Sequence, residues 1–394
     1  MFYQILKYGS ITVGSIAASY LGLLALMTTS WFQAHVVYLH AIQMTWFKDL
    51  DVPELFGFLH NQVTPFEIKS AGGETLYAWH VLPLGLYRKH EHELLAEPSG
   101  LIPDITSSLA FRLLRDDPEA RLAIHFHGAG GTVASGYRCP NYRALSAGDP
   151  NRIHVLTFDY RGFGRSSGTP TERGVIADAI SVVEWALNTA GIPASRILIY
   201  SQSLGTAVNM AVAEHFSQQE PPSIFKGHIL TAPFADVASL VSTYSVAGTI
   251  PILGPFARFP ALFEILKGFI YDKWSTKDRI ASYVNTNEAN GKDYRITLIH
   301  AEDDYDIPWS HTSQLFWHAV KACSKRDMTF EELSEVKSKA SQDLGYAGTV
   351  MEWKTSCGTI REELLKYGLH DVIMGNPVVT MAVMRIFDGE EADP

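Results

Sequence analysis

Short apolar runs alternate with helix-like stretches along most of the chain, and this alternation constrains the fold more than any other feature. The runs hold few polar residues, which is typical of strands buried on both faces of a parallel sheet. The pattern therefore predicts a doubly wound, mostly parallel α/β sheet with its ligand site at the carboxyl ends of the strands. The predicted strands are Arg121–His127, Ile153–Phe158, Ile197–Tyr200, Gly227–Leu230 and Ile296–His300, and the predicted helices are Val175–Leu187, Ala207–Phe216 and Thr312–Val320.

A hairpin is predicted ahead of this sheet, from Phe66–Lys69 and Leu76–Leu82. A Rossmann dinucleotide site is the main alternative for such an alternation. It requires G-x-G-x-x-G after an early strand, and the glycines of the only similar stretch, residues 127–131, stand at the wrong offsets.

The sequence Ser201-Gln202-Ser203-Leu204-Gly205 directly follows a predicted strand and precedes a predicted helix. This context matches the G-x-S-x-G nucleophile elbow, in which a sharp turn lifts a serine hydroxyl clear of the sheet. The turn crowds the residues two before and two after the nucleophile, so both must be small, and Ser201 stands where glycine is usual. An ordinary serine helix cap is the alternative, but the flanking strand and helix favour Ser203 as a nucleophile.

A glycine-rich turn at residues 127–131 follows the predicted strand Arg121–His127. Such a turn points backbone N–H groups into the site, and ester hydrolysis requires donors of this kind for the oxyanion of its tetrahedral intermediate. We expect the amides of Ala129 and Leu204 to be these donors. A flexible loop without this role is the alternative.

Three aspartates follow the predicted strand Ile296–His300, at the place where a catalytic acid is expected. Asp304 fits the strand-end pattern D-x-x-(V/I)-P, because Ile307 and Pro308 follow it at the required offsets. Asp303 and Asp306 are then expected to be solvated loop residues.

The catalytic base should follow the acid, in the chain order Ser, Asp, His. Three histidines do so: His311, His318 and His370. The first two fall in or at the start of a predicted helix, where a core or surface role is expected. His370 lies between the expected last strand, Thr349–Lys354, and the last helix, Pro377–Phe387. We expect it to take the proton of Ser203, with Asp304 fixing its tautomer.

The N-terminal part of the chain carries no aspartate, glutamate, lysine or arginine from Tyr8 to Phe47. As a helix, residues 10–32 would rise roughly 34 Å, enough to cross the hydrocarbon core of a bilayer. We predict a single membrane anchor there, with Trp31, Tyr38 and Trp46 near one interface. A cleaved signal peptide or a buried amphipathic helix is the alternative. The few flanking charges leave open which side of the membrane the remaining domain faces.

The composition argues against one class of partner. The chain has 32 lysines and arginines against 42 aspartates and glutamates, a net charge of −10. A nucleic-acid-binding protein needs a basic face for phosphates, so no nucleic-acid partner is expected. The three cysteines, Cys139, Cys323 and Cys357, form no metal-binding motif. Neither a metal nor another cofactor is expected.

These motifs, together with Thr157–Gly164 (TFDYRGFG) and Gly168–Gly174 (GTPTERG), resemble those of the membrane-anchored α/β-hydrolase domain-containing lipases. The similarity runs from about Leu122 to about Phe387, and an N-terminal anchor belongs to the same pattern. It implies an α/β-hydrolase fold and a serine ester hydrolase that acts on lysophosphatidylserine or monoacylglycerols. Two departures concern substrate preference more than chemistry: Ser201 in the elbow, and a long stretch between acid and base.

The expected organisation is an anchor at residues 1–50 and a hydrolase domain at 51–394, with a cap at about 236–290 and an insertion at about 323–367. Within the cap, Val241–Tyr271 is strongly apolar, notably in Ile250–Phe256 and Phe263–Tyr271. A lid packed on the core explains this, and so does a cap that receives acyl chains or dips into a membrane. The two interpretations are compatible.

We therefore expect a single-pass membrane protein of the endoplasmic reticulum that cleaves single-chain glycerolipids, lysophospholipid or monoacylglycerol, through an acyl-enzyme on Ser203. The lipid would arrive laterally from the bilayer. An acyl-protein thioesterase would use the same triad and is the first alternative. A hydrolase-fold scaffold or lipid-binding receptor is the second, and a missing triad member would favour it. A prolyl-oligopeptidase would need a propeller domain, for which the chain has no room.

Overall fold

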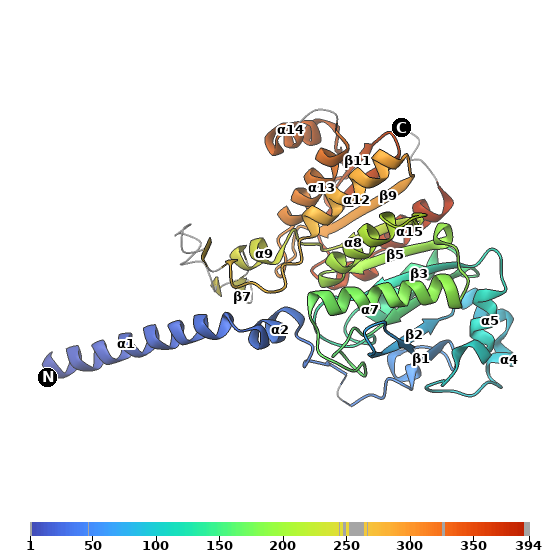
Figure 1. The fold of residues 1–394 in the computed structure, drawn as a ribbon, viewed down its shortest axis with the longest axis horizontal. Helices are drawn as coiled ribbons and strands as arrows, with labels where there is room; N and C mark the ends of the chain where they lie inside the picture. Colours follow the sequence, from blue (N-terminus) through green and yellow to red (C-terminus); the bar gives the residue numbers. More distant parts are fainter. Residues whose placement is uncertain are drawn as a thin grey trace.

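The structure, a computed structural model, describes residues 2–389 apart from Trp46, Tyr244, Leu266 and the ranges 247–249, 252–263 and 325–327. Its centre is a ten-stranded sheet in the order β1-β2-β4-β3-β5-β6-β9-β12-β11-β10 (Figure 1). The strands are β1 Val63–Lys69, β2 Thr75–Val81, β3 Arg121–Phe126, β4 Ile153–Phe158, β5 Ile197–Gln202, β6 Gly227–Thr231, β9 Tyr294–Ala301, β10 Gln342–Asp343, β11 Thr349–Lys354 and β12 Gly358–Leu365.

The six central strands, from β4 to β12, run parallel to one another. The predicted hairpin of β1 and β2 joins one side of them in antiparallel pairing, and β11 and β10 join the other. The predicted doubly wound, mostly parallel sheet is thus confirmed.

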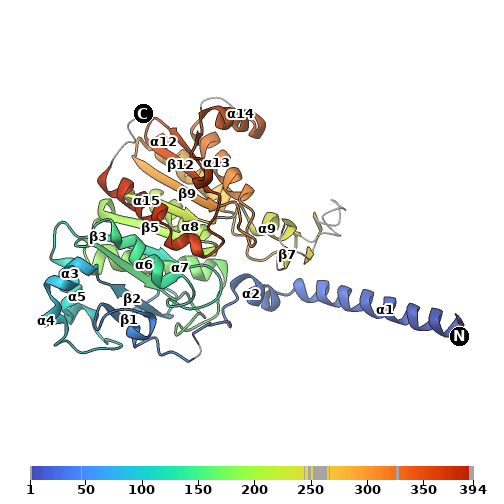
Figure 2. The same ribbon diagram turned by 180° about the vertical axis from the view of Figure 1, so that it is seen from behind.

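Helices cover both faces of the sheet. Four of them, α7, α8, α12 and α13, pack on one face, and α6 and α15 pack on the other, as the opposite views in Figures 1 and 2 show. The principal helices are α1 Phe2–Met27, α2 Ser30–Tyr38, α3 Leu84–Lys89, α4 Glu91–Leu94, α5 Leu109–Arg115, α6 Arg138–Ala147, α7 Glu172–Glu184, α8 Leu204–Ser217, α9 Val237–Thr243, α12 Thr276–Asn290, α13 Ser310–Cys323, α14 Phe330–Ala340 and α15 Pro377–Asp388.

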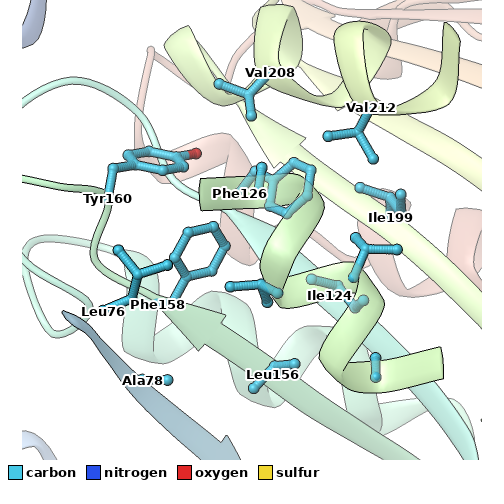
Figure 3. Packing of buried hydrophobic residues seen from close by; sticks show 14 of the residues in the cluster. Leu76, Ala78, Ile124, Phe126, Leu156, Phe158, Tyr160, Ile199, Val208 and Val212 are labelled. Carbon is cyan, nitrogen blue, oxygen red and sulfur yellow. The ribbon is translucent and has the colours of Figure 1, made fainter. Parts of the chain in front are cut away.

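The core follows from the alternation of side chains along each strand. In β5, Ile197 and Ile199 belong to the cluster that includes the buried side of α8, whereas Leu198 and Tyr200 belong to the cluster with α6 and α15. Figure 3 shows the first cluster, with Val208 and Val212 of α8 above the strands. Each fully buried aliphatic side chain contributes roughly 1.5–3 kcal/mol, so the elements that carry the site rest on a rigid base.

The stretch predicted as an insertion, residues 323–367, contains three strands of the main sheet, β10, β11 and β12. β11 was predicted as the last strand, but β12 follows it and pairs in parallel with β9. The prediction missed β12 because its charged residues suggest an exposed segment. In the fold, these charges are paired. Glu363 accepts hydrogen bonds from Arg361 and Arg385, at 2.7 and 2.6 Å, and Glu362 pairs with Lys337.

The N-terminal helix α1 projects away from the domain (Figures 1 and 2). It ends at Met27, short of the predicted end of the span at residue 32, and α2 starts anew with Thr29 as its N-cap. Within the described part of the chain, Lys7–Met27 is the one helical stretch long and apolar enough to cross a membrane, and it is not buried.

The structure also shifts the domain boundary predicted at residue 50. Two residues at or ahead of that boundary belong to the core of the hydrolase domain: Tyr38 is fully buried in one core cluster, and Leu50 belongs to a second. Of the predicted apolar cap, α9 and a short pair formed by β7 (Ser245–Val246) and β8 (Ile250–Pro251) are described. Most of the run Ile250–Phe256, with Phe263 and the predicted interface residue Trp46, lies outside the described residues.

Candidate active site

Ser203 stands on a sharp turn between β5 and α8. Its backbone has φ 53° and ψ −123°, a conformation that costs a non-glycine residue on the order of 1–3 kcal/mol. The Ser203 amide donates to the carbonyl of Thr231 at 3.0 Å, which ties the turn to β6. A Cβ at Gly205 would lie 2.1 Å from the carbonyl oxygen of Phe126, so only glycine fits there. This is the geometry of a nucleophile elbow.

Ser201, where glycine is usual, is accommodated by hydrogen bonds. The side chain is fully buried. Its hydroxyl donates to the carbonyl of Ile229 and accepts from Asn209 Nδ2, both at 2.9 Å. Asn209 Oδ1 in turn lies 2.7 Å from His228 Nδ1. The departure from the glycine pattern thus adds a polar link between β5, β6 and α8 and leaves the turn intact.

Asp304 and His370 are in direct contact, although they are 66 residues apart in sequence. His370 Nδ1 lies 2.8 Å from Asp304 Oδ2, and Asp304 Oδ1 accepts from the amides of Asp306 and Ile307 at 2.8 and 2.9 Å. Burial alone would raise the pKa of Asp304, but hydrogen bonds from His300 and His370 hold it well below its usual range. Burial alone would lower the pKa of His370, but Asp304, with Asp371 and Asp306, outweighs burial and raises it.

Three side chains that sequence reasoning did not assign hold this pair in place. His300 Nε2 lies 3.1 Å from Asp304 Oδ2, so the carboxylate has two imidazole partners. Asp303, expected to be solvated, accepts from the amides of Gly368 and Leu369 at 2.9 and 2.8 Å and so fixes the loop that carries His370. Gln202 Nε2 donates to the carbonyl of His370 at 3.3 Å. The expectation for Asp303 was wrong because nothing local reveals these amides.

The other candidate residues have different surroundings. His311 is buried, and its Nδ1 accepts from the amide of Ala235 at 3.3 Å. His318 packs edge-on against Trp317. Asp306 is exposed as expected, although it also lines the cavity described below. Among the hydrogen bonds of the described residues given above, none links Asp306, His311 or His318 to His370 or Ser203.

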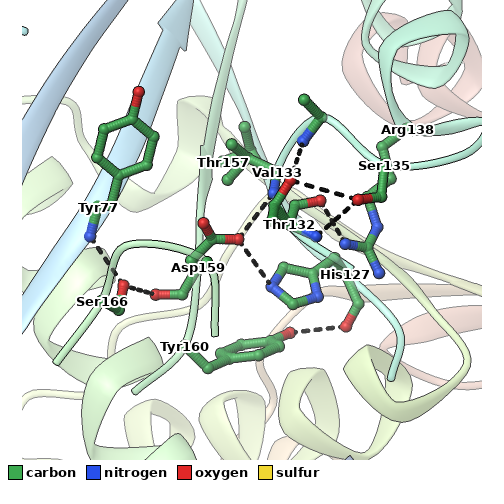
Figure 4. Close-up of polar contacts among 12 residues, drawn as sticks. Tyr77, His127, Thr132, Val133, Ser135, Arg138, Thr157, Asp159, Tyr160 and Ser166 are labelled. Atoms are coloured by element: carbon green, nitrogen blue, oxygen red, sulfur yellow. Dashed lines mark hydrogen bonds and ion pairs between the residues drawn. The ribbon is translucent and has the colours of Figure 1, made fainter. Parts of the chain in front are cut away.

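The glycine-rich turn after β3 is held from behind by a buried arginine (Figure 4). Arg138 donates to the carbonyls of Gly128 and Gly130, at 3.1 and 2.7 Å, and to that of Thr132. His127 Nδ1 lies 2.7 Å from the same Gly128 carbonyl. Because that carbonyl and the amide of Ala129 belong to one planar trans peptide, fixing the carbonyl also fixes the direction of the Ala129 N–H.

Two buried titratable side chains, His127 and Asp159, lie beside this turn. Burial, and then the charge of Arg138, hold the pKa of His127 well below its usual value, so its ring is neutral. Asp159 accepts from the amide of Val133 at 2.7 Å, and burial raises the pKa of its carboxyl to about 7. Asp159 Oδ1 lies 3.7 Å from His127 Nε2. The motif Thr157–Gly164 therefore serves to brace the turn.

A family model described as "Alpha/beta hydrolase family" matches residues 123–330, which include Ser203 and Asp304. The chain belongs to the alpha/beta hydrolase family. It is 27% identical over 294 residues to the lysophosphatidylserine lipase ABHD12 of Danio rerio, a match that covers 74% of this chain and 67% of that protein. It is 26% identical over 318 residues to the protein of the same name from Macaca fascicularis, over 80% of this chain and 69% of that one.

A solved structure supports the same fold. An alpha-beta hydrolase from Vibrio vulnificus superimposes with a TM-score of 0.53 at 15% identity, over 91% of this chain and 92% of that one. In the present chain, one cavity of about 500 Å³ is lined by Ser203, His370, Ala129 and Leu204. Asp304 contacts His370 from outside this lining.

The remaining walls of that cavity are largely apolar. They come from the segment after α1, from the predicted cap and from the loops after β6 and β9, and they include Val36, Val37, Leu39, Met44, Phe234, Val237, Leu240, Val241 and Ile307. A cavity of this kind, with few convergent polar groups, suits a ligand with an apolar body and one reactive polar bond.

Among the described residues, one group could in principle hold a metal ion: Asp304, Asp306 and His370. Two of its three members are the directly bonded acid–base pair. Because His370 Nδ1 and Asp304 Oδ2 already bond each other at 2.8 Å, we assign the group to proton transfer.

Proposed function

We propose that this protein is a serine hydrolase that cleaves the carboxylic ester of single-chain glycerolipids, a lysophospholipid or a monoacylglycerol, with Ser203, Asp304 and His370 as its triad. The observation that carries the proposal is the 2.8 Å contact between His370 and Asp304 in the wall of the apolar cavity onto which Ser203 opens. The names of the relatives support a lysophospholipid.

The reaction has two halves. His370 Nε2 takes the proton of the Ser203 hydroxyl as its oxygen attacks the ester carbonyl, and the amides of Ala129 and Leu204 bind the resulting oxyanion. Collapse of the tetrahedral intermediate expels the glycerol oxygen, which receives the proton from His370, and leaves the acyl group on Ser203. Water then attacks this acyl-enzyme with His370 as base, which releases the fatty acid and restores the serine.

As part of the same proposal, the protein is a single-pass protein of the endoplasmic reticulum membrane. The apolar stretch Lys7–Met27 in α1 supports membrane attachment. Co-fractionation with an endoplasmic reticulum marker tests the choice of membrane.

A fluorophosphonate probe tests the catalytic part of the proposal. The full chain should be labelled at Ser203 and lose labelling in Ser203→Ala, while Ser334→Ala, an exposed serine of α14, serves as the matched control. In a separate assay, unlabelled protein is offered lysophosphatidylserine, a monoacylglycerol and an S-acylated peptide. Preference for the peptide would establish the thioesterase instead, and absence of both labelling and turnover would leave the scaffold or receptor.

A further inference from the structure

We propose that α2 and α9 form the two walls of an acyl-chain channel, which runs from Ser203 to the end of the membrane helix α1. The lipid's acyl chain is its occupant. This inference rests on the proposed function and deepens it, because it assigns a site for the substrate's chain and a direction from which the chain enters.

The first observation is that two cavities share a wall. The catalytic cavity is about 500 Å³, and a second apolar cavity of about 90 Å³ lies next to it. Four side chains line both of them: Val36 and Val37 of α2, and Val237 and Val241 of α9. Two cavities that share four wall residues are direct neighbours, and we infer that a lipid chain passes between these valines from one to the other in contact with apolar surface.

The second observation is where this passage leads. The far cavity is lined by Leu24 and Met27, the last turn of α1, and by Phe32 of α2. The stretch that could cross a membrane ends at Met27. With α1 in a bilayer, the outer end of the passage therefore lies at the membrane surface, and an acyl chain can pass from the bilayer to Ser203 without crossing water. Figures 1 and 2 show α9 on the same side of the domain as α1 and α2.

The third observation is that the α2 wall is fixed to the domain on both sides. On the catalytic side, the amides of Gly130 and Gly131 donate to the carbonyls of Tyr38 and Ile42, at 2.7 and 2.6 Å. On the cap side, the Tyr38 hydroxyl donates to Asp272 at 2.7 Å. Gln33 also bonds the cap, at the carbonyl of Phe269 at 2.7 Å and the amide of Tyr271 at 3.0 Å.

These contacts make α2 a part of the site and not a loose linker. A wall that is bonded to both the glycine-rich turn and the cap keeps the channel aligned with Ser203. Val36 is the best position for a probe, because it lines both cavities and is still 51% exposed. A large side chain there enters the passage without displacing the core.

The test uses the full chain in lipid nanodiscs, with monoacylglycerols of four and sixteen acyl carbons. In Val36→Trp, the ratio of kcat/KM for the long chain to that for the short chain should fall about tenfold or more, because the bulk displaces several methylenes from apolar contact. Val52→Trp, at a partly exposed valine outside both cavities, should keep the wild-type ratio. An unchanged ratio in Val36→Trp overturns the channel.

A direct readout comes from an alkyl fluorophosphonate with a diazirine at the end of a long chain. Once it has reacted with Ser203, irradiation should crosslink it to residues 24–37 or 237–241, and Val36→Trp should reduce that crosslinking. Crosslinks to other segments overturn the channel while the proposed chemistry stands. If the probe does not react with Ser203 at all, the proposed function fails, and the channel fails with it.

Discussion

Replacing Asp304 by asparagine tests the acid assignment with the least change in shape, and the structure determines how the new side chain would be oriented. Asp304 Oδ1 accepts from the amides of Asp306 and Ile307. Those two donors require an oxygen, so the asparagine amide oxygen takes this position. Its NH₂ group then replaces Oδ2 and faces Nδ1 of His370.

The NH₂ group can only donate a hydrogen bond, so His370 must accept at Nδ1 and carry its proton on Nε2. Nε2 is the atom that should accept the proton of Ser203, so the base is held in the wrong tautomer. The expected loss is about 10⁴-fold in kcat, or about 5.5 kcal/mol of transition-state stabilisation. Steady-state hydrolysis of a soluble short-chain ester measures it, and far-UV circular dichroism checks that the variant is folded.

Asp306→Asn is the matched control, because Asp306 is exposed and lines the same cavity. It should retain at least about a third of wild-type kcat, since it makes no contact that sets the His370 tautomer. The reasoning is refuted if Asp304→Asn keeps more than about a tenth of the activity, or if Asp306→Asn loses more than Asp304→Asn does.

Three further predictions follow. The pKa of His370 is raised above 6.5, and only the neutral imidazole is a base. The value of kcat/KM should therefore fall as the pH drops through a value above 6.5, and this acid limb should move to lower pH in Asp304→Asn. An acid limb below pH 6.5 in the wild type contradicts the assignment. Ser201→Ala should lower the free energy of unfolding in urea by about 1–3 kcal/mol, because it leaves buried partners in β6 and α8 unpaired, and no loss would mean that the hydroxyl is dispensable. Arg138→Met should lower kcat by up to about 10²–10³-fold with a smaller effect on KM, because the Ala129 amide loses its fixed direction; a change in KM alone would contradict a positioning role.

The proposed nucleophile and acid could be predicted because each has a local signature, and the proposed base because it must follow the acid. The elbow around Ser203 and the strand-end pattern at Asp304 depend on a few neighbouring residues, and chain order then left His370 as the base outside the helices. The structure places His370 against Asp304, and the strands that precede Ser203 and Asp304, β5 and β9, were predicted to within two residues at each end.

The supporting residues were not predictable because their partners lie far away in sequence. Arg138 reads as an ordinary helix residue until its guanidinium is seen against the carbonyls of the glycine-rich turn. Asp303 has the sequence context of a loop residue, and its partner, the amide of Gly368, is 65 residues away in sequence. β12 was missed for a related reason: its charges suggest exposure, and only the paired fold shows that they are neutralised.

The largest correction concerns the segment after the membrane helix, and it changes how anchor and catalysis are connected. The sequence places residues 1–50 together because none from Tyr8 to Phe47 is charged. In the fold, that uniform stretch divides at Thr28 and Thr29, between an exposed helix and a helix bonded to the glycine-rich turn. Since the amides of Gly130 and Gly131 donate to the carbonyls of Tyr38 and Ile42, these carbonyls also fix the backbone directly after Ala129. The proposed oxyanion donor therefore depends on the residues that directly follow the apolar helix α1.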